Sequence, residues 1–282
     1  MLNPLDREQL LPRLERAGFR FSKGLGQNFV TAPWVPETLA EAAGCGKNTA
    51  VLEVGPGAGA LTRCLAHRAG SVTAVEKDER ILPVLREAVE DFDNVRIVSG
   101  DILKLDLRAL AEAMPEKEKV AAANLPYSIT TQAVEALVAP GVFSRVAVMV
   151  QREAADRLLS RPGDRDWCLS AARVGWRYEG RRIAQVPPDC FVPAPHVVSE
   201  ILCFDRLEAP RVPVRDENAF LRVLSAAFFQ RRKTFANSAA AALGIERERV
   251  SAALLEAGLP PTVRGEALDY GELARVAEAL YP

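Results

Sequence analysis

The sequence has few cysteines and histidines, no long apolar run and no excess of charge of one sign. Its five cysteines are odd in number and show no Cys-x-x-Cys spacing, which argues against both a disulfide framework and a zinc site. Two isolated histidines, His67 and His196, do not indicate a metal centre. No apolar run is long enough to span a bilayer, and the charged N-terminal segment is unlike a signal peptide. We therefore expect a cytoplasmic protein with reduced thiols, no metal and no contact with a membrane.

Charge is nearly balanced, with a net charge of −1, but it is distributed unevenly. Nine arginines crowd the middle of the chain, and acidic residues are interleaved with them. The acids are Glu153, Asp156, Asp164 and Asp166. For about half of these arginines we expect solvated faces with local ion pairs. The others are expected to line a surface that contacts phosphates, a task that suits arginine better than lysine. A basic triplet, Arg231 to Lys233, follows later in the chain. The central arginines are Arg145, Arg152, Arg157, Arg161, Arg165, Arg173, Arg177, Arg181 and Arg182.

Apolar runs separated by stretches with helical periodicity predict an α/β fold with a doubly wound parallel sheet. The segment up to about residue 45 is predicted to be mainly helical. A loop over residues 23–28 is expected to close over a ligand. The expected strands are 50–54, 71–75, 95–98, 119–123, 145–150, 173–186 and 199–205, with a helix at 151–160.

A proline-containing linker divides the chain into two expected domains. Pro210 and Pro213 mark this linker, so we place the domains at 1–208 and 209–282. The second domain should be small and all-helical, because its alanine- and leucine-rich stretches have helical periodicity. The basic triplet is expected on one of these helices. The expected helices are 217–229, 232–243, 246–257 and 270–280.

Three glycines follow the first buried strand, in the turn Gly55-Pro56-Gly57-Ala58-Gly59. Glycine is needed where the backbone turns tightly and approaches a ligand closely. The next two strands lead into acidic residues, Glu76 and Asp101. Glu76 is placed to accept hydrogen bonds from both hydroxyls of a ribose, as in dinucleotide-binding folds. These features predict a cofactor that contains adenosine, either NAD or S-adenosylmethionine.

The tetrapeptide Asn124-Leu125-Pro126-Tyr127 stands where a fourth strand ends. Asn124 offers an amide oxygen that accepts a hydrogen bond from an amine, and Pro126 forces its predecessor into an extended conformation that aims neighbouring carbonyls at the same amine. Tyr127 supplies a face for stacking. In isolation such a box is equally typical of a capped turn with a buried tyrosine. After the glycine turn it favours S-adenosylmethionine, because it provides an acceptor for the amine that takes a methyl group.

These motifs occur together with several others, in the order of a known family. They are 25–30, 53–59, 76–78, 100–103, 124–127, 151–157, 191–195 and 229–234. With these motifs the chain resembles the bacterial small-subunit (16S) ribosomal RNA adenine N6,N6-dimethyltransferases, from the N-terminal segment almost to the end. Because so many motifs keep their order, an accidental resemblance is not expected.

Three positions depart from the family pattern. Val30 ends a box that usually ends in leucine, and Val198 precedes Ser199 where an aspartate is common. The basic segment continues with Phe235-Ala236-Asn237 instead of Leu-Arg-Asn. None of these changes removes a group expected to act in catalysis. The changes at Val198 and Ala236 bear on how this chain docks on RNA.

The resemblance implies a Rossmann-like class I methyltransferase sheet whose antiparallel edge is the strand pair at 173–186 and 199–205. It implies that methyl groups pass from S-adenosylmethionine to N6 of two adjacent adenosines in a hairpin loop near the 3′ end of 16S rRNA. The partner would be an immature small ribosomal subunit, and the free protein is expected to be a monomer. Which adenosines are modified, and whether in naked RNA or in a partly assembled subunit, is left open.

The resemblance also implies roles for individual residues. Tyr127 and Phe191 would stack on the two faces of an adenine that has been unstacked from its RNA. The expected cofactor contacts are Asn28, Val30 through its backbone, Gly55, Gly57, Glu76, Asp101 and Asn124. The expected catalytic residues are Asn124, Leu125, Tyr127 and Phe191, and the expected RNA contacts are Arg152, Arg231, Arg232 and Lys233.

Other functions compete with this interpretation. The large-subunit adenine dimethyltransferases that confer macrolide resistance share the first four motifs and the Asn124 box, whereas the proline box 191–195 and the segment 228–233 favour the small-subunit enzyme. A non-catalytic RNA-binding assembly factor would keep the fold as a scaffold, but it would not need Glu76 or Asp101. An NAD enzyme is disfavoured because no group for a hydride-transfer substrate is evident.

Overall fold

The computed structural model describes residues 2–19 and 28–281, so the expected loop over 23–28 and the motif residues 25–27 lie almost wholly outside the described part. The chain forms two compact units. One consists of Met1–Ala155 and Gly180–Arg206, the other of Asp156–Glu179 and Leu207–Pro282. Among the described residues, no helix combines the length and the apolar character needed to cross a bilayer.

A seven-stranded sheet in the order β4-β3-β2-β5-β6-β9-β7 forms the centre of the first unit. Strands β4, β3, β2, β5 and β6 pair in parallel, and β9 is antiparallel to β6. The α/β fold with a doubly wound parallel sheet is thereby confirmed, as are the first five predicted strands. The strands are β2 (Thr49–Val54), β3 (Ser71–Glu76), β4 (Val95–Ser99), β5 (Glu118–Asn124), β6 (Arg145–Gln151), β7 (Tyr178–Val186) and β9 (Ser199–Arg206).

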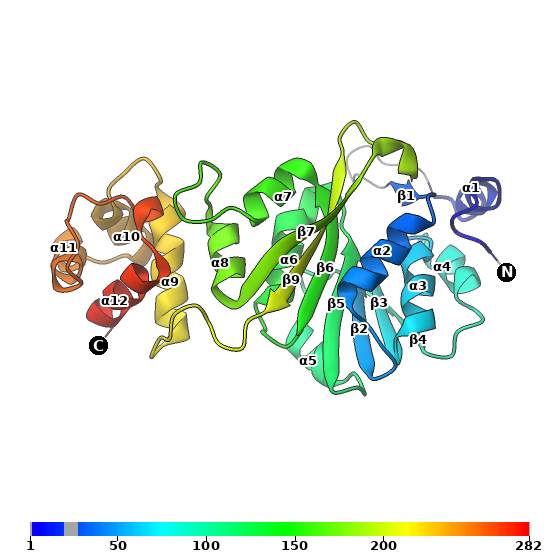
Figure 1. Cartoon of the computed structure of the whole chain (residues 1–282), viewed down its shortest axis with the longest axis horizontal. Helices are drawn as coiled ribbons and strands as arrows, with labels where there is room; N and C mark the ends of the chain where they lie inside the picture. Colours follow the sequence, from blue (N-terminus) through cyan, green and yellow to red (C-terminus); the bar gives the residue numbers. More distant parts are fainter. Residues whose placement is uncertain (1, 20–27, 282) are drawn as a thin grey trace. The chain divides into compact units, whose positions relative to one another are not determined.

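Helices cover both faces of this sheet, as its apolar strands require. Figure 1 shows α2 (Trp34–Ala43) and α3 (Ala60–Arg68) on one face, and α5 (Leu107–Glu112) and α6 (Thr130–Val138) on the other. Side chains of alternate strand residues, such as Val51 and Val120, pack against buried residues of α2 and α3. Two faces buried in this way explain why the central strands are almost continuously apolar.

The N-terminal segment is tied to the sheet unit at two places. Helix α1 (Arg7–Arg16) begins at Asp6, whose side chain accepts hydrogen bonds from the backbone of Glu8 and Gln9, and it packs on α4 (Leu82–Ala88). Strand β1 (Phe29–Val30) pairs antiparallel with β8 (Phe191–Val192), so Val30 lies opposite Phe191. Periodicity cannot predict so short a pair, because two residues contain no repeat.

The predicted strand at 173–186 is wrong in its first part. Residues Leu169–Arg177 form helix α8, and only Tyr178–Val186 form β7. Ala172 and Trp176 are spaced one helical turn apart and pack into the core of the second unit. A short apolar run of this kind is compatible with a strand or a helix. The burial of one helical face in the second unit favours the helix. The second strand of the pair, β9, is confirmed.

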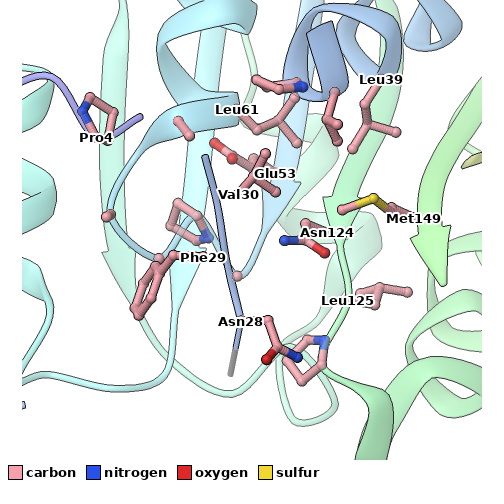
Figure 2. Close-up of a pocket in the computed structure, with 18 of the residues that line it drawn as sticks. Pro4, Asn28, Phe29, Val30, Leu39, Glu53, Leu61, Asn124, Leu125 and Met149 are labelled. Atoms are coloured by element: carbon pink, nitrogen blue, oxygen red, sulfur yellow. The ribbon is translucent and has the colours of Figure 1, made fainter. Parts of the chain in front are cut away.

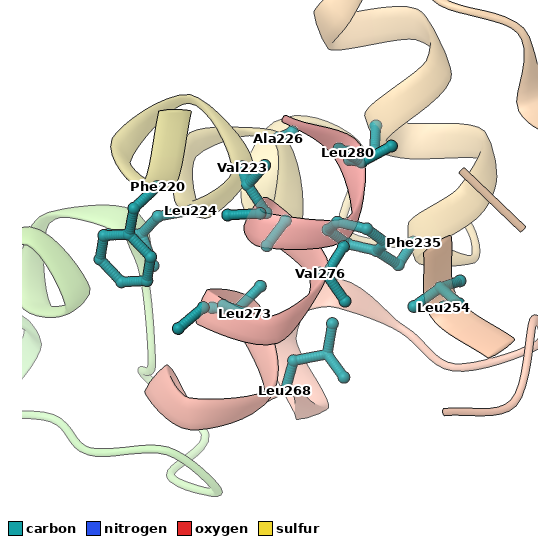
Figure 3. Close-up of a cluster of buried hydrophobic side chains, with 14 of the residues drawn as sticks. Phe220, Val223, Leu224, Ala226, Phe235, Leu254, Leu268, Leu273, Val276 and Leu280 are labelled. Atoms are coloured by element: carbon teal, nitrogen blue, oxygen red, sulfur yellow. The ribbon is translucent and has the colours of Figure 1, made fainter. Parts of the chain in front are cut away.

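After the linker the second unit is helical, and Figure 3 shows the side chains of its buried cluster. Phe220 and Leu224 of α9 meet Phe235 of α10, Leu254 of α11 and Val276 of α12 in one buried cluster. Asp216 caps α9, and Asp269 forms a capping box with Glu272 at the start of α12. Its helices after the linker are α9 (Glu217–Phe229), α10 (Phe235–Leu243), α11 (Arg247–Glu256) and α12 (Tyr270–Leu280).

The basic triplet Arg231 to Lys233 lies in a turn, so its predicted place on a helix is wrong. Helix α9 ends at Phe229, and α10 begins only at Phe235. The buried Ser238 holds this turn, because its Oγ donates to Ala226 O at 2.7 Å and accepts from Gln230 N at 2.9 Å. A side chain that satisfies the backbone of a turn competes with continuation of the helix.

Ala236 is buried in the core of the second unit, with 1 % of its surface exposed. It stands where the family pattern has an arginine. In this chain the position therefore presents no side chain to a partner.

Replacement of Ser238 by alanine should destabilise the second unit by about 1–3 kcal/mol, because a buried carbonyl and a backbone N–H lose their partner. Chemical denaturation followed by circular dichroism measures this change. Ser251→Ala on α11, at a partly exposed serine, is the matched control and should change the free energy of unfolding by less than about 0.5 kcal/mol. Equal stability of the two variants would contradict the role given to Ser238.

Candidate active site at the carboxyl edge of the sheet

Polar residues gather where the parallel strands end. Val54 of β2 lies opposite Val75 of β3 and Ala123 of β5, so Glu76 and Asn124 follow on either side of the glycine turn. This carboxyl edge is where ligands bind in open α/β sheets. Parallel pairing thus brings together residues that lie some seventy positions apart in the sequence.

Two glycines of the turn adopt conformations that other residues avoid. Gly55 has φ 66° and Gly57 has φ 55°, both in the left-handed region. Gly57 N donates to Glu76 Oε2 at 3.1 Å, and Gly55 N donates to Val75 O at 3.0 Å. These bonds join the turn after β2 to the end of β3. Because Gly55 and Gly57 have no side chain, the backbone of the turn is open to close approach by a ligand.

Two cavities meet at this turn. One, of about 120 Å³, is lined by residues of the glycine turn, the Asn124 box, α2 and the β1–β8 pair. The other, of about 420 Å³, lies along the ends of β3 and β4 and includes Asp101 and Ile102. Gly55, Glu76 and Pro126 line both. The two hollows are therefore neighbours that share a wall.

The structure brings all the expected cofactor-contact and catalytic residues to this site. The smaller cavity is lined by Asn28, Val30, Gly55, Gly57, Glu76, Asn124, Leu125, Tyr127 and Phe191. Asp101 lines the larger cavity, next to Gly55 and Glu76. In Figure 2, Glu53 and Asn124 point into the space beside the segment that carries Asn28 and Val30. The arrangement accommodates an extended ligand with different chemistry at its two ends.

Glu53 is a functional candidate that the sequence reasoning did not single out. Its carboxylate is buried, lines the smaller cavity, and neither oxygen has a hydrogen-bond partner among the described residues. Burial raises the pKa of Glu53 to about 8; the Thr62 hydroxyl acts in the opposite direction, and Glu76 raises the pKa further. The available signal was an acid inside an otherwise apolar strand, directly before the glycine turn. A buried acid without a partner is costly in its charged form, and a cationic group placed beside it would offset this cost.

Glu76 is held by the backbone on both oxygens. Oε1 accepts from Asp78 N at 2.8 Å, and Oε2 accepts from Gly57 N. Burial raises the pKa of Glu76, while these backbone hydrogen bonds act against the rise. The carboxylate is thus fixed in orientation between the two cavities, where it can accept further hydrogen bonds from a ligand.

Asp101 remains a charged acceptor in the larger cavity. Lys77 Nζ lies 2.9 Å from Oδ2, and Leu103 N donates to Oδ1 at 3.1 Å. These two interactions, first the hydrogen bond from Lys77, lower the pKa of Asp101. Its neighbour Ile102 is buried and adds an apolar surface suited to a flat ring.

The Asn124 box follows β5 directly. Leu125 is buried, and its N donates to Met149 O at 3.2 Å, which holds the backbone of the box against β6. Tyr127 begins a short 3₁₀ turn, Tyr127–Ile129, and its hydroxyl lies 3.5 Å from Ser199 Oγ. Among the described residues, no hydrogen bond to the Asn124 amide competes with a ligand at this cavity.

The expected RNA contacts divide into paired and unpaired side chains. Arg152 Nε lies 3.3 Å from Glu200 Oε1, and Arg231 Nε lies 2.9 Å from Glu266 Oε2. Arg232 and Lys233 are exposed, and within the described chain neither side chain forms an ion pair. Arg152 belongs to the sheet unit and the triplet to the helical unit.

In the part of the chain that the structure describes, no three His, Cys, Asp or Glu side chains are grouped so as to hold a metal ion. The chemistry of this edge is thus carried by carboxylates, one amide and aromatic faces.

Comparison with known proteins identifies relatives over nearly the whole chain. Residues 18–276 match the family pattern "Ribosomal RNA adenine dimethylase". The chain is 42 % identical over 273 residues to "Ribosomal RNA small subunit methyltransferase A" of Streptococcus gordonii, covering 95 % of this chain and 94 % of the relative. It is 40 % identical over 275 residues to the protein of that name from Geobacillus thermodenitrificans, with the same coverage of 95 % and 94 %.

Solved structures share the fold. "23S rRNA methyltransferase ErmE" is 26 % identical, with a TM-score of 0.62 over 90 % of this chain and 100 % of its own. A dimethyladenosine transferase from Plasmodium falciparum is 21 % identical, with a TM-score of 0.69 over 88 % of this chain and 95 % of its own. The predicted class I methyltransferase sheet is confirmed by these similarities.

Glu53 should make the stability of the ligand-free protein fall as pH rises. Its pKa is about 8 in the folded protein and near 4.5 when unfolded, so the folded state binds the extra proton between these values. The stability contribution is retained below about pH 4.5 and lost as pH rises through 8, with a total of about 5 kcal/mol.

Denaturation of wild type and Glu53→Gln at about pH 5, 6.5 and 8 measures this effect. The variant has no titrating group at this position, so its stability should exceed that of wild type by a margin that grows with pH. Glu37→Gln, at an exposed acid in the first turn of α2, is the control. A margin independent of pH would show that Glu53 is ionised throughout.

Proposed function

The chain belongs to the ribosomal RNA adenine dimethylase family, and we propose that it transfers methyl groups from S-adenosylmethionine to N6 of adenosine in ribosomal RNA. The observation that carries this proposal is one site that joins the unpaired buried Glu53 to the Asn124 amide and the Tyr127 ring. The Glu53 carboxylate suits the ammonium of an amino-acid moiety. The other two suit a planar base with an exocyclic amine.

The residues present fit the methyl donor along the whole site. S-adenosylmethionine supplies an electrophilic methyl group on a sulfonium when bound. Glu53 lies where it would accept the ammonium, and Glu76 where it would accept the ribose hydroxyls. Asp101 and Ile102 would hold the adenine, by its amine and its face. Asn28 and the backbone of Val30 would close the site, and Gly55 and Gly57 leave room for the backbone to approach it.

Adenine N6 is a poor nucleophile, because its lone pair is delocalised into the ring. Hydrogen bonds from N6 to Asn124 Oδ1 and to the Leu125 carbonyl would favour localisation of that pair toward the methyl group. Tyr127 and Phe191 would hold the base between two faces. No strong general base is needed, since the amine loses its proton after it has become cationic.

We further propose that the substrate is the small-subunit RNA, at two adjacent adenosines in a hairpin loop near its 3′ end, within an immature subunit. The proteins named small subunit methyltransferase A support this choice over the large-subunit type, because they are 42 % and 40 % identical over 95 % of the chain. Single-stranded loops are where RNA bases can be unstacked and read. The protein would act in the cytoplasm and be a monomer when free.

For the two predicted domains, we propose that 1–208 performs methyl transfer and that 209–282 binds RNA. The turn after α9 supports an RNA contact, because Phe229 is 60 % exposed beside Arg232 and Lys233. Aromatic faces and cations together suit stacking on bases and contact with phosphates. Within the first range, residues Asp156–Glu179 pack with the helical unit, so we assign this segment to RNA binding and not to methyl transfer.

Tritiated S-adenosylmethionine, immature small subunits that lack adenine methylation, and large-subunit RNA as a parallel substrate test this function. After digestion to nucleosides, label in N6,N6-dimethyladenosine from the small subunit alone is the expected result. Label from the large-subunit RNA would favour the resistance-type enzyme. No label in either, together with no cofactor binding by calorimetry, would favour a scaffold.

Asn124→Ala should lower kcat about a hundredfold, because the N6 amine loses an oriented partner in the transition state. The affinity for S-adenosylhomocysteine should change far less, since Glu53, Glu76 and Asp101 remain. Asn124→Asp retains an acceptor and should keep more activity than the alanine variant. Single-turnover methyl transfer and calorimetry measure both quantities, and equal rates for alanine and wild type would exclude Asn124 from catalysis.

The double variant Arg232→Ala/Lys233→Ala should weaken RNA binding and make it less dependent on salt. Two lost phosphate contacts reduce the slope of log affinity against log salt concentration by about 2. Arg247→Ala, at an exposed arginine on α11 of the same unit, is the control, and its slope should change by less than about 1. Identical slopes for both variants would place the RNA contact elsewhere.

A further inference from the structure

Glu200 of β9 is an almost completely buried carboxylate, with 2 % of its side chain exposed, and two arginines share it. Arg152 Nε lies 3.3 Å from Oε1, while Arg182 of β7 pairs with Oε2. Arg152 also donates to Gln185 Oε1 at 3.1 Å. The side chains of Arg152 and Arg182 remain 48 % and 42 % exposed. A single buried acid thus orients two cationic groups at the surface of the sheet unit.

The two arginines are held at the same carboxyl edge of the sheet as the Asn124 box, because Arg152 follows the end of β6 and Glu200 stands at the start of the antiparallel β9. Ser199 precedes Glu200 on β9, and its Oγ lies 3.5 Å from the Tyr127 hydroxyl. Ser199 is paired with Gln151, the residue before Arg152, and Arg152 N donates to Val198 O at 3.1 Å. The guanidinium pair is therefore anchored at the end of β6 and the start of β9, where Ser199 contacts Tyr127 from the opposite face of the strand.

The chemistry of the pair suits a phosphate. Each guanidinium carries five N–H donors in a rigid fork, more than a shared carboxylate can accept. Donors on the exposed part of each fork can bind a second anion in a bidentate manner. An enzyme that holds one base out of its stack must also hold the backbone that carries this base, and phosphate contacts supply that register.

We propose that Arg152 and Arg182, oriented by Glu200, form a clamp for a phosphate adjacent to the adenosine that is methylated. The proposal rests on the proposed function, since it assumes that the target base enters the pocket beside Asn124 and Tyr127. Glu200 is a positioning residue in this clamp. It acts only through the orientation of the two arginines.

Arg181 provides a matched control on the same strand. It is 49 % exposed and pairs with Asp205, as Arg145 does. Asp205 lies five positions beyond Glu200 on β9, so the two acids face opposite sides of the sheet. Arg181→Ala therefore removes the same charge as Arg182→Ala from the adjacent position, on the other face.

The first test compares wild type with Arg182→Ala, Arg182→Lys, Arg152→Ala and Arg181→Ala on small-subunit RNA. The clamp predicts that Arg182→Ala and Arg152→Ala raise KM for RNA about tenfold, with kcat within about twofold of wild type, and reduce the salt slope by about 1. Arg182→Lys should behave like Arg182→Ala, because lysine keeps the charge but loses the fork. Arg181→Ala should resemble wild type.

The second test uses Glu200→Gln, for which a clamp and a diffuse positive surface predict opposite results. This variant removes a negative charge, so a diffuse surface would bind RNA more tightly. The clamp predicts RNA binding about fivefold weaker, because the forks lose their charged anchor. Thermal unfolding and the affinity for S-adenosylhomocysteine identify any variant that fails to fold, and Arg182→Lys then decides.

Two outcomes separate the clamp from the function on which it rests. Methylation by wild type, with Arg182→Ala and Arg182→Lys at unchanged KM and salt slope, would overturn the clamp alone. Absence of RNA methylation by wild type would overturn the proposed function and the clamp with it.

Discussion

In β2, every residue from Ala50 to Val54 is paired on both sides, with β3 and with β5, and the strand is buried along its whole length. The site depends on this double pairing, because it fixes where three strands end relative to one another. The glycine turn, Glu76 and Asn124 owe their proximity to the register of these ladders. A slip of one residue would turn every side chain to the other face of the sheet, and Glu53 would then leave the cavity.

The same rigidity explains how the protein keeps an unpaired acid inside. Glu53 lies on an inner strand of the sheet, where backbone hydrogen bonds to the strands on both sides prevent it from moving toward water. A carboxylate in such a place takes up a proton unless a cation arrives, which is why its pKa is raised to about 8. Buried Glu53 thus lowers the free energy of unfolding as pH rises, and a cationic ligand bound beside it would restore this free energy. Strained or unsatisfied groups are concentrated at functional sites for this reason.

Charge is organised differently in the two units. In the sheet unit the arginines at the carboxyl edge are held by acids, as Arg152 and Arg182 are by Glu200. In the helical unit Arg232 and Lys233 extend from a turn that is held by the hydrogen bonds of Ser238. Oriented guanidinium groups define a geometry, whereas free side chains contribute mainly attraction at a distance. The net charge of −1 therefore does not reveal the local cationic surfaces that this chain presents.

The sequence by itself determined the strands of the parallel sheet, the four C-terminal helices apart from the start of the second, and most of the residues that meet at the carboxyl edge. Strands and helices follow from local apolar patterns, and the site residues follow from polar residues placed directly after the strands. Both signals can be read in short stretches of sequence. Only the tertiary structure decided that Leu169–Arg177 is a helix, that Arg231 to Lys233 form a turn, and that Val30 pairs with Phe191. It also decided that Glu53 has no partner and that Glu200 has two. Such features depend on which distant groups come into contact, and neither a local pattern nor a spacing contains that information.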